Sequence, residues 1–290
     1  PHAGMRLVFD AAPVGRNAGT PGGAKPSRRA TCSPPGDFSA ALASPVAGAS
    51  KWVMAAPASI EAVLFDVFGT VLDWRRSIVE EGERLAALEQ VDWAAVADEW
   101  RREGYLRPIR QMVAGERPWA PIDKIMRQEL DGLAERYGFA GLGASALDDL
   151  SKVWERLLPW PDAAKGLDRL RARYIIGPLS NGTFGALTRM ARHAGLRWDC
   201  VISAELFRTY KPDPRVYEGA ASLLGLPPER VMLVAAHPSD LRAARACGLA
   251  TAHVPRPLEW GPGGPAEETA RDEFDVIAPD FLALADILGR

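Results

Sequence analysis

Four side chains in this sequence have the types and positions that a covalent hydrolytic reaction requires. Asp66, Ser180, Lys211 and Asp240 each lie at the end of a predicted buried strand or just beyond it. A carboxylate that is shielded from water becomes an effective nucleophile when a nearby cation and hydrogen-bond donors keep it ionised and aimed. We therefore interpret Asp66 as the nucleophile and Lys211 as its cation, although taken alone such an Asp is more often a helix cap or turn former and such a Lys is usually a surface charge.

The strand that presents Asp66 is the apolar run at 60–65, and it is followed at once by Asp66-Val67-Phe68-Gly69-Thr70. Such a run predicts a buried parallel strand with a tight turn at its carboxyl end. Further apolar runs, interpreted as strands, alternate with amphipathic stretches, interpreted as helices. The strands are expected at 174–181, 200–203, 231–236, 250–254 and 274–277, and the helices at 183–194, 213–224, 239–247 and 280–288. This alternation predicts an α/β fold with a doubly wound parallel sheet, a Rossmann-like core, whose strand ends gather at one edge.

The stretch between the first strand and the others has a helical pattern instead. Apolar residues at three- and four-residue spacing predict amphipathic helices at 77–89, 92–106, 122–137 and 146–158, with no convincing strand among them. We therefore expect a helical cap domain at 75–163, inserted into an α/β core domain formed by 58–74 and 164–290. Residues 1–57 are rich in Pro, Gly, Ala and Arg and are expected to be a disordered extension, with Met54 as an alternative translation start.

The composition points to a small-molecule partner. The 290 residues are 47% hydrophobic and 25% charged, with a net charge of −2, so nothing indicates binding to nucleic acid or to an anionic membrane. Three cysteines lie far apart, which is unsuited to a disulfide framework and typical of the cytoplasm. No apolar run approaches the roughly 18 residues of a membrane span.

Four motifs together resemble the L-2-haloacid dehalogenases of the haloacid dehalogenase superfamily. They are Asp66 to Thr70, the Leu-Ser-Asn-Gly run at 179–182, the Tyr-Lys-Pro-Asp-Pro-Arg-Val-Tyr run at 210–217, and Asp240. The resemblance covers essentially everything from residue 60 onward. It implies a hydrolase without cofactor or metal that converts short (S)-2-haloalkanoic acids into inverted 2-hydroxy acids and halide through an aspartyl ester. It also suggests a homodimer.

The resemblance implies catalytic roles for Asp66, Thr70, Arg101, Ser180, Lys211 and Asp240. Asp66 attacks the halogen-bearing carbon, and Asp240 is the base for the water that later cleaves the ester. Lys211 lies close to both, Thr70 orients Asp66, and the Ser180 hydroxyl suits the substrate carboxylate. Arg101, in the predicted cap, is the position that receives the departing halide.

Substrate-binding roles are implied for Phe68, Asn181, Tyr217 and His237. Asn181 shares the halide with Arg101, and Tyr217 orients Lys211. His237 departs from the usual family pattern, as do Ala235, Ala236 and Ser239 beside it. We hypothesise that His237 takes the place of an amide as a hydrogen-bonding partner for water or substrate.

Phe68 is the residue that separates the branches of the superfamily. The phosphatase branch carries a second Asp at that position as general acid and holds Mg²⁺ with paired acids near the last motif, where this chain has only Asp240. Metal-free chemistry is therefore expected. Two alternatives stay open: an Mg²⁺-dependent phosphatase or phosphonatase, and a non-catalytic binding protein, which the changes at Ala235, Ala236 and Ser239 would permit.

Overall fold

The computed structural model of the chain describes residues 59–85, 90–265, 267, 269, 270 and 272–289. The expected extension at 1–57 and the alternative start at Met54 lie outside the described residues, so both stay predictions. None of the helices in the described ranges combines the length and the apolar character needed to cross a membrane.

The core of the described chain is a parallel sheet of six strands in the order β5-β4-β1-β6-β7-β8. Its strands are β1 (Ala62–Phe65), β4 (Ile175–Ser180), β5 (Ile202–Ser203), β6 (Val231–Ala235), β7 (Ala250–His253) and β8 (Val276–Ile277). The chain passes from β1 to β4 and β5 on one side and then to β6, β7 and β8 on the other, which confirms the predicted doubly wound topology. The direction of winding reverses at β1, and such a switch point is where open α/β sheets bind ligands.

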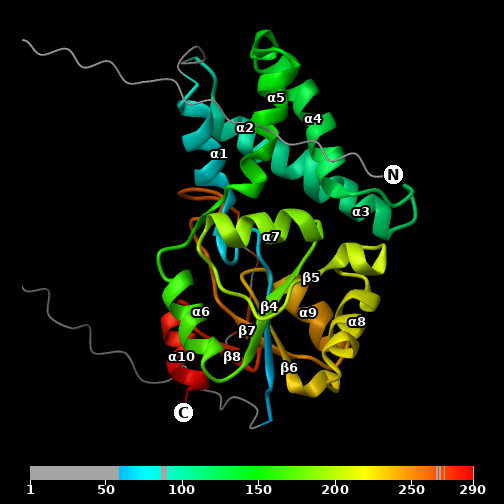
Figure 1. The fold of residues 1–290 in the computed structure, drawn as a ribbon, viewed down its shortest axis with the longest axis vertical. Coiled ribbons are helices and arrows are strands. Elements are labelled where there is room, and N and C mark those ends of the chain that lie inside the picture. Colours follow the sequence, from blue (N-terminus) through cyan, green and yellow to red (C-terminus); the bar gives the residue numbers. More distant parts are fainter. Residues whose placement is uncertain (1–58, 86–89, 266, 268, 271, 290) are drawn as a thin grey trace, which may run out of the picture. The chain divides into compact units, whose positions relative to one another are not determined.

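Helices cover both faces of this sheet (Figure 1). They are α6 (Ala163–Arg171), α7 (Phe184–His193), α8 (Pro214–Leu224), α9 (Pro238–Ala246) and α10 (Phe281–Leu288). Figure 1 shows α6 and α10 together on one side and α8 and α9 on the other. Two of these helices begin where the sequence predicts, each with a capping side chain. The Asp213 carboxylate accepts a hydrogen bond from the backbone N–H of Arg215 at the start of α8, and the Thr183 hydroxyl accepts one from the backbone N–H of Ala186 at the start of α7.

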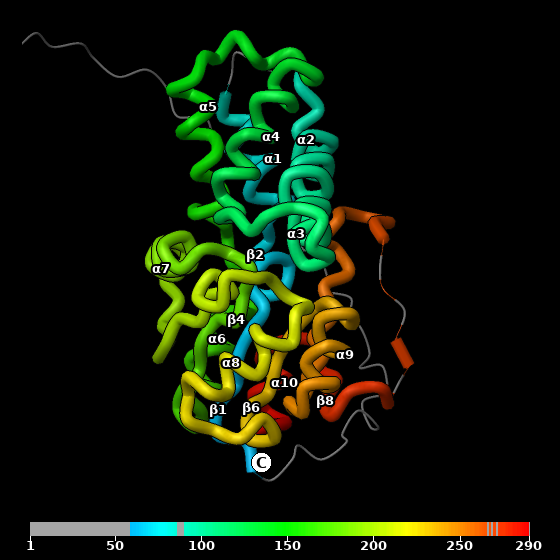
Figure 2. The backbone as a smooth tube through the Cα atoms, turned by 90° about the vertical axis from the view of Figure 1, so that its right-hand side faces the viewer, coloured from blue at the N-terminus to red at the C-terminus, as the bar shows by residue number. Residues whose placement is uncertain are grey.

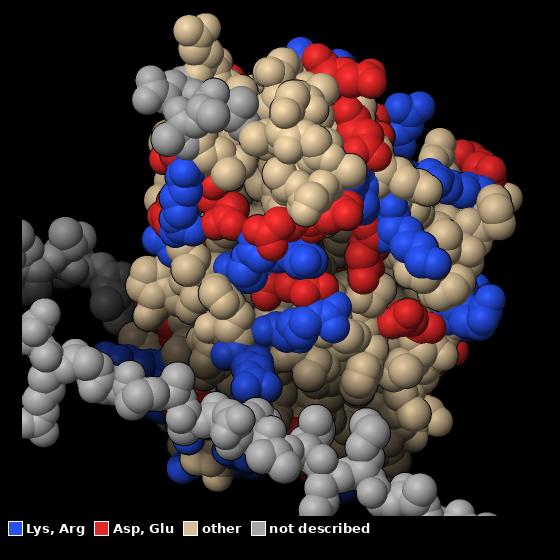
Figure 3. All heavy atoms as spheres, turned by 45° about the horizontal axis from the view of Figure 1, so that its top comes forward, with Lys and Arg blue, Asp and Glu red and all other residues tan. Residues whose placement is uncertain are grey.

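A block of helices lies at the carboxyl end of the sheet (Figure 2). It contains α1 (Trp74–Glu83), α2 (Trp93–Glu99), α3 (Arg107–Val113), α4 (Ile122–Arg136) and α5 (Ala144–Ser151), with the short segments η2 (Trp100–Leu106), η3 (Ala140–Leu142) and η4 (Lys152–Glu155). Two further turns, η5 (Ala204–Phe207) and η6 (Pro228–Arg230), belong to the core. On the face seen in Figure 3, acidic and basic side chains are interspersed. Ion pairs within the helical block include those of Arg136 with Glu99 and Glu129. The boundaries of the expected domains stay a prediction.

Two details of the helical block differ from the sequence prediction. The expected strand-free stretch ends in a two-residue strand, β3 (Leu158–Pro159), which pairs antiparallel with β2 (Leu72–Asp73). Two residues are too few to show a periodic pattern. The helix expected at 92–106 widens into π-helical geometry in η2 and continues to Val113. Wide turns of this kind are rare in proteins, and those that occur are often found at functional sites.

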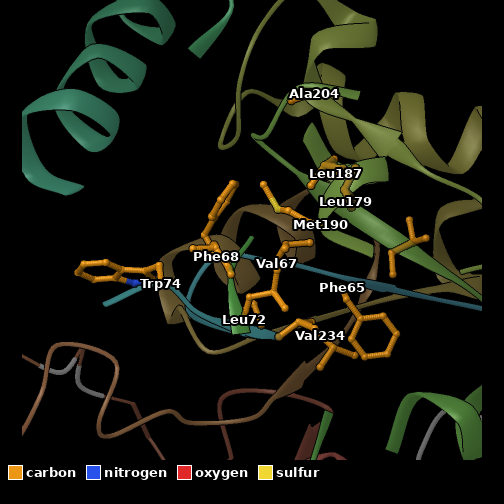
Figure 4. Packing of buried hydrophobic residues seen from close by; sticks show 14 of the residues in the cluster. Phe65, Val67, Phe68, Leu72, Trp74, Leu179, Leu187, Met190, Ala204 and Val234 are labelled. Atoms are coloured by element: carbon orange, nitrogen blue, oxygen red, sulfur yellow. The ribbon is translucent and has the colours of Figure 1, made fainter. Parts of the chain in front are cut away.

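The central strand is completely buried. All four residues of β1 have no exposed surface, as expected for a parallel sheet covered on both faces. Figure 4 shows Phe65 and Val234 on one side of Val67, and Phe68 and Trp74 on the other. Trp74 is the first residue of α1, and Phe68 contacts Tyr105 and Trp154 of the helical block.

Candidate active site

Asp66 lies immediately after β1, where the tight turn at Gly69 (φ +87°) folds the chain back over the strand end. Its Oδ1 accepts a hydrogen bond from Lys211 Nζ at 2.9 Å. Its Oδ2 accepts from the Thr70 hydroxyl at 2.8 Å and lies 3.1 Å from His237 Nδ1. Burial opposes the charge, but Lys211 and His237 outweigh it and hold the pKa of Asp66 well below its usual range. The carboxylate is therefore ionised and fixed in orientation.

Lys211 bridges the two predicted aspartates. Its Nζ donates to Asp66 Oδ1 and, at 2.5 Å, to Asp240 Oδ2, and the side chain is 6% exposed. The Tyr217 hydroxyl donates to the other Asp240 oxygen at 2.6 Å. Burial lowers the pKa of Lys211, yet Asp240 and Asp66 together raise it. Burial raises the pKa of Asp240, and Lys211 partly offsets that rise.

His237 is held between two acids. Its Nδ1 faces Asp66 and its Nε2 lies 2.9 Å from Glu259 Oε2. Burial disfavours the imidazolium, but Glu259 and Asp66 raise the pKa of His237 well above 6.5. In turn, His237 outweighs burial and lowers the pKa of Glu259. His237 is therefore a cation that donates to both carboxylates.

The sequence prediction missed Glu259, which is 6% exposed in the loop after β7. Its Oε1 also accepts from Trp74 Nε1 at 2.8 Å. A Cβ at Gly69 would lie 2.1 Å from this oxygen, so the first turn needs a glycine both for its positive φ and for the space that Glu259 fills. One signal in the sequence could have found Glu259: it is an acid that follows shortly after β7, and the carboxyl end of β7 lies at the same edge of the sheet as Asp66.

Arg101 reaches the site from the π-helical segment η2 and is 4% exposed. Its guanidinium carbon lies 4.2 Å from the ring centroid of Tyr105, 5.5 Å from that of Trp74 and 5.7 Å from that of Phe68. Among the described residues, its buried Nε and Nη1 have no hydrogen-bond partner. Since buried donors are almost always satisfied, these two are available to a bound anion.

Tyr105 is the second residue that the sequence prediction missed. It lies four positions after Arg101 on the same helical segment and contacts both Arg101 and Phe68. Burial raises its pKa to about 12, so its phenol stays protonated. The spacing of four from a candidate arginine was the signal that could have found it.

Asn181, predicted to share the halide with Arg101, holds the backbone of Lys211, and its role toward a halide stays a prediction. Its Oδ1 accepts from the Lys211 backbone N–H at 2.7 Å, and its Nδ2 donates to the Lys211 carbonyl at 3.3 Å. The neighbouring Ser180 is completely buried, and its Oγ accepts from the Gly182 N–H at 3.4 Å. This contact is typical of a local turn, so its expected role toward the substrate carboxylate stays a prediction.

A cavity of about 250 Å³ joins these groups. It is lined by Asp66, Arg101, Tyr105, Leu106, Asn181, Lys211, Pro212, His237, Ser239, Asp240, Glu259, Trp260 and Glu267. Six of the ten predicted site residues are in this lining. Phe68, Thr70, Ser180 and Tyr217 are not, although Phe68, Thr70 and Tyr217 each contact a lining residue. No group of three His, Cys, Asp or Glu side chains within the described ranges is placed to hold a metal ion.

Comparison with known proteins gives consistent matches. Residues 60–248 match the model of the haloacid dehalogenase-like hydrolase family. The (S)-2-haloacid dehalogenase of Xanthobacter autotrophicus is 31% identical over 246 residues, which is 79% of this chain and 93% of that protein. The solved structure of the L-2-haloacid dehalogenase PA0810 is 44% identical, with a TM-score of 0.74 over 79% of this chain and 99% of that one. A structure of the L-2-haloacid dehalogenase from Xanthobacter autotrophicus with chloropropionic acid covalently bound is 27% identical, with a TM-score of 0.65 over 79% and 98%.

Proposed function

Because the chain belongs to the haloacid dehalogenase-like hydrolase family, we propose that it hydrolyses short (S)-2-haloalkanoic acids to inverted 2-hydroxy acids and halide. One observation supports this function above the others: the ionised Asp66 and the unsatisfied guanidinium of Arg101 line the same small cavity. A nucleophile and an anion acceptor in one cavity are what displacement of a halide requires.

The first step forms an ester on Asp66. Its Oδ2 is held by Thr70 and His237, whereas within the described part of the chain Oδ1 accepts from Lys211 alone. Oδ1 is therefore the freer oxygen, and it attacks the substrate carbon from the side opposite the halogen. A carbon–oxygen bond forms as the carbon–halogen bond breaks, and the halide departs with the bonding pair. Arg101 stabilises the negative charge that develops on the halogen.

The second step cleaves the ester without touching the inverted carbon again. Water attacks the Asp66 carboxyl carbon, and Asp240 takes its proton. The negative charge that develops on Oδ2 meets the Thr70 hydroxyl and the His237 imidazolium, which already lie within 3.1 Å of that atom. The bond from the carboxyl carbon to Oδ1 then breaks, Oδ1 leaves with the product, and Asp240 returns the proton to it. The oxygen of the water stays in Asp66, whose carboxyl group releases the second proton of the water as it ionises again.

Phe68 argues against the phosphatase alternative. Its ring is 3% exposed and packs against Tyr105 and Trp154, with centroids 5.2 and 5.8 Å away. The position that would carry a general acid toward a phosphate ester is therefore an apolar side chain packed behind the lining of the site. We keep metal-free chemistry, a cytoplasmic location and a homodimer as parts of the proposal.

A single turnover in ¹⁸O-labelled water tests the proposal. Enzyme in excess is mixed with (S)-2-chloropropanoate without added metal and with EDTA present, and chloride, product and the Asp66 peptide are analysed. We expect stoichiometric chloride, unlabelled (R)-lactate and label in Asp66. Label that appears directly in the lactate would reject the ester. No chloride, together with Mg²⁺-dependent release of phosphate from phosphate esters, would establish the alternative, and ligand binding without any turnover would identify a binding protein.

A further inference from the structure

Glu259 is a buried acid that neither step of the proposed reaction uses. It is 6% exposed and lines the cavity beside His237. His237 Nε2 lies 3.1 and 2.9 Å from its two carboxylate oxygens, and the Trp74 indole N–H donates to Oε1 at 2.8 Å. Burial opposes the charge of Glu259, but the neighbouring His237 more than offsets that effect, so the pKa of Glu259 is lowered. The carboxylate is therefore ionised and fixed in orientation within the site.

His237 lies between two carboxylates that have different fates in the reaction. Its Nδ1 is 3.1 Å from Asp66 Oδ2, and its Nε2 pairs with Glu259. Ester formation converts the Asp66 carboxylate into a neutral group, so one of these two negative charges disappears after the first step. Glu259 makes and breaks no bond and keeps its charge. In the ester, Glu259 is therefore the carboxylate in contact with His237 that still stabilises the imidazolium.

Resting on the proposed function, we propose that Glu259 is a positioning residue for the second step: its carboxylate holds the His237 ring against Asp66 Oδ2 and keeps that ring cationic after the nucleophile has lost its charge. The imidazolium is then in place when negative charge develops on Oδ2, and His237 keeps both ring protons throughout the step. A neutral ring would still donate one hydrogen bond through Nδ1 but would lack the positive charge that stabilises the oxyanion.

The pH dependence of the second step reports on this role. The titratable and charged groups around His237 are Asp66 and Glu259 in contact with it, Lys211 and Asp240 beyond Asp66, Arg101 near Glu259, and His253 and Glu267 nearby. Burial lowers the pKa of His237, but Glu259 and Asp66 more than offset this and raise it. The imidazolium is present below that raised pKa and is lost as the pH rises through it. Loss of the Glu259 charge therefore moves the alkaline limit of ester hydrolysis to lower pH.

Glu259→Gln removes the charge and keeps the shape of the side chain. The Gln oxygen can accept from Trp74, and its amide can donate to Nε2 of a neutral His237. Asp73→Asn is the matched control, because Asp73 is a buried acid close enough to Glu259 for the two charges to repel each other. The Asp73 carboxylate caps α1 through the backbone N–H of Arg76, and an Asn caps a helix equally well. The control thus removes a neighbouring buried charge while the contact of Glu259 with His237 stays.

The rate constant of each step is measured against pH with (S)-2-chloropropanoate, from rapid-quench chloride release and from mass spectrometry of the ester on the Asp66 peptide. We expect Glu259→Gln to form the ester at a rate close to that of wild type. Its alkaline limit of ester hydrolysis should move down by about one to three pH units, and above that limit hydrolysis should be about 10²-fold slower. Glu259→Asp, which keeps the charge, should have an intermediate limit, and Asp73→Asn should not move it.

A double variant tests whether Glu259 acts through His237. In a His237→Asn background, Glu259→Gln should slow ester hydrolysis no further. The inference is wrong if Glu259→Gln slows hydrolysis by the same factor in both backgrounds, slows both steps equally at every pH, or leaves the alkaline limit unmoved. It is equally wrong if Asp73→Asn moves the limit as far. Wild-type protein that releases no chloride would instead refute the proposed function, so the two failures are distinguishable.

Discussion

Removal of the Tyr217 hydroxyl tests the assignment of Asp240 as the base of the second step. The change Tyr217→Phe deletes a completely buried donor that lies 2.6 Å from Asp240 Oδ1, and it leaves Lys211 as the remaining partner in the described contacts of that carboxylate. The hydrogen bond from Tyr217 favours the ionised form of Asp240, so its loss raises a pKa that burial has already raised. The base must be ionised to act, so the acid limb of the rate profile moves to higher pH.

The size of the shift follows from the strength of the bond. A hydrogen bond to a charged group contributes about 1.5–3 kcal/mol, and one pKa unit corresponds to about 1.36 kcal/mol. The acid limb of kcat should therefore move upward by about one to two pH units. The same change should lower the free energy of unfolding by about 1–3 kcal/mol, because a buried acceptor loses its donor.

The assay is the pH dependence of kcat for (S)-2-chloropropanoate between the acid limit of stability and neutral pH, with urea unfolding in parallel. Tyr210→Phe is the matched control, because Tyr210 lies in the same motif and donates its hydroxyl to the Ala120 carbonyl at 2.7 Å. The control removes one buried phenol oxygen at a distance from Asp240, so it should lower stability without moving the acid limb. If the acid limb of the kcat profile does not move in Tyr217→Phe, or moves by the same amount in both variants, Asp240 is not the base that titrates.

Three further changes probe other parts of the site. Asp66→Asn should lower kcat by about 10⁴-fold or more, with an unchanged near-ultraviolet circular dichroism spectrum; substantial residual halide release would exclude Asp66 as nucleophile. Arg101→Lys should slow ester formation by about 10²–10³-fold in rapid-quench experiments and leave ester hydrolysis unaffected, since the planar group between the rings is lost; equal slowing of both steps would contradict a halide role. Arg256→Leu should cost about 3 kcal/mol of unfolding free energy, because the bidentate pair of Arg256 with Asp162 at 2.8 and 2.9 Å is largely shielded from water. Arg215→Leu, which breaks a more exposed pair with Asp213, should change the urea midpoint little. Similar losses in both variants would show that shielding of the pair from water is not what matters.

The sequence was sufficient to predict the sheet and the cluster of Asp66, Lys211 and Asp240 at its edge. Apolar runs ending in Asp66, Ser180 and Ala235 have the length and composition of buried parallel strands, and the ends of such strands must meet. The contacts of Lys211 with Asp66 and Asp240 follow from that topology. These features are local patterns joined by one general rule of sheet geometry.

The remaining features depend on interactions that no local pattern encodes. Glu259 lies in a loop that is held by the contact of Trp260 with Trp74 and by the hydrogen bond from Trp74 to Glu259. Neither a helical nor a strand periodicity relates Glu259 to the other motifs, so the sequence pattern does not place it in the site. The widening of the helix at η2 is a small change in hydrogen bonding that residue types do not report. Ser180 shows the opposite case, since its position was predicted but its hydroxyl bonds the backbone N–H of Gly182.

The wide turn at η2 has a consequence for the number of residues that the helix needs at this point of the chain. A π-helical turn holds more residues than an α-helical one. Shortening η2 by one residue, for example at the half-buried Glu103, would let the helix regularise with Arg101 and Tyr105 three positions apart instead of four. Residues three and four apart lie on the same face of an α-helix, so the two side chains would stay neighbours. The wide turn therefore contains one residue that the helix can lose without turning Tyr105 away from Arg101.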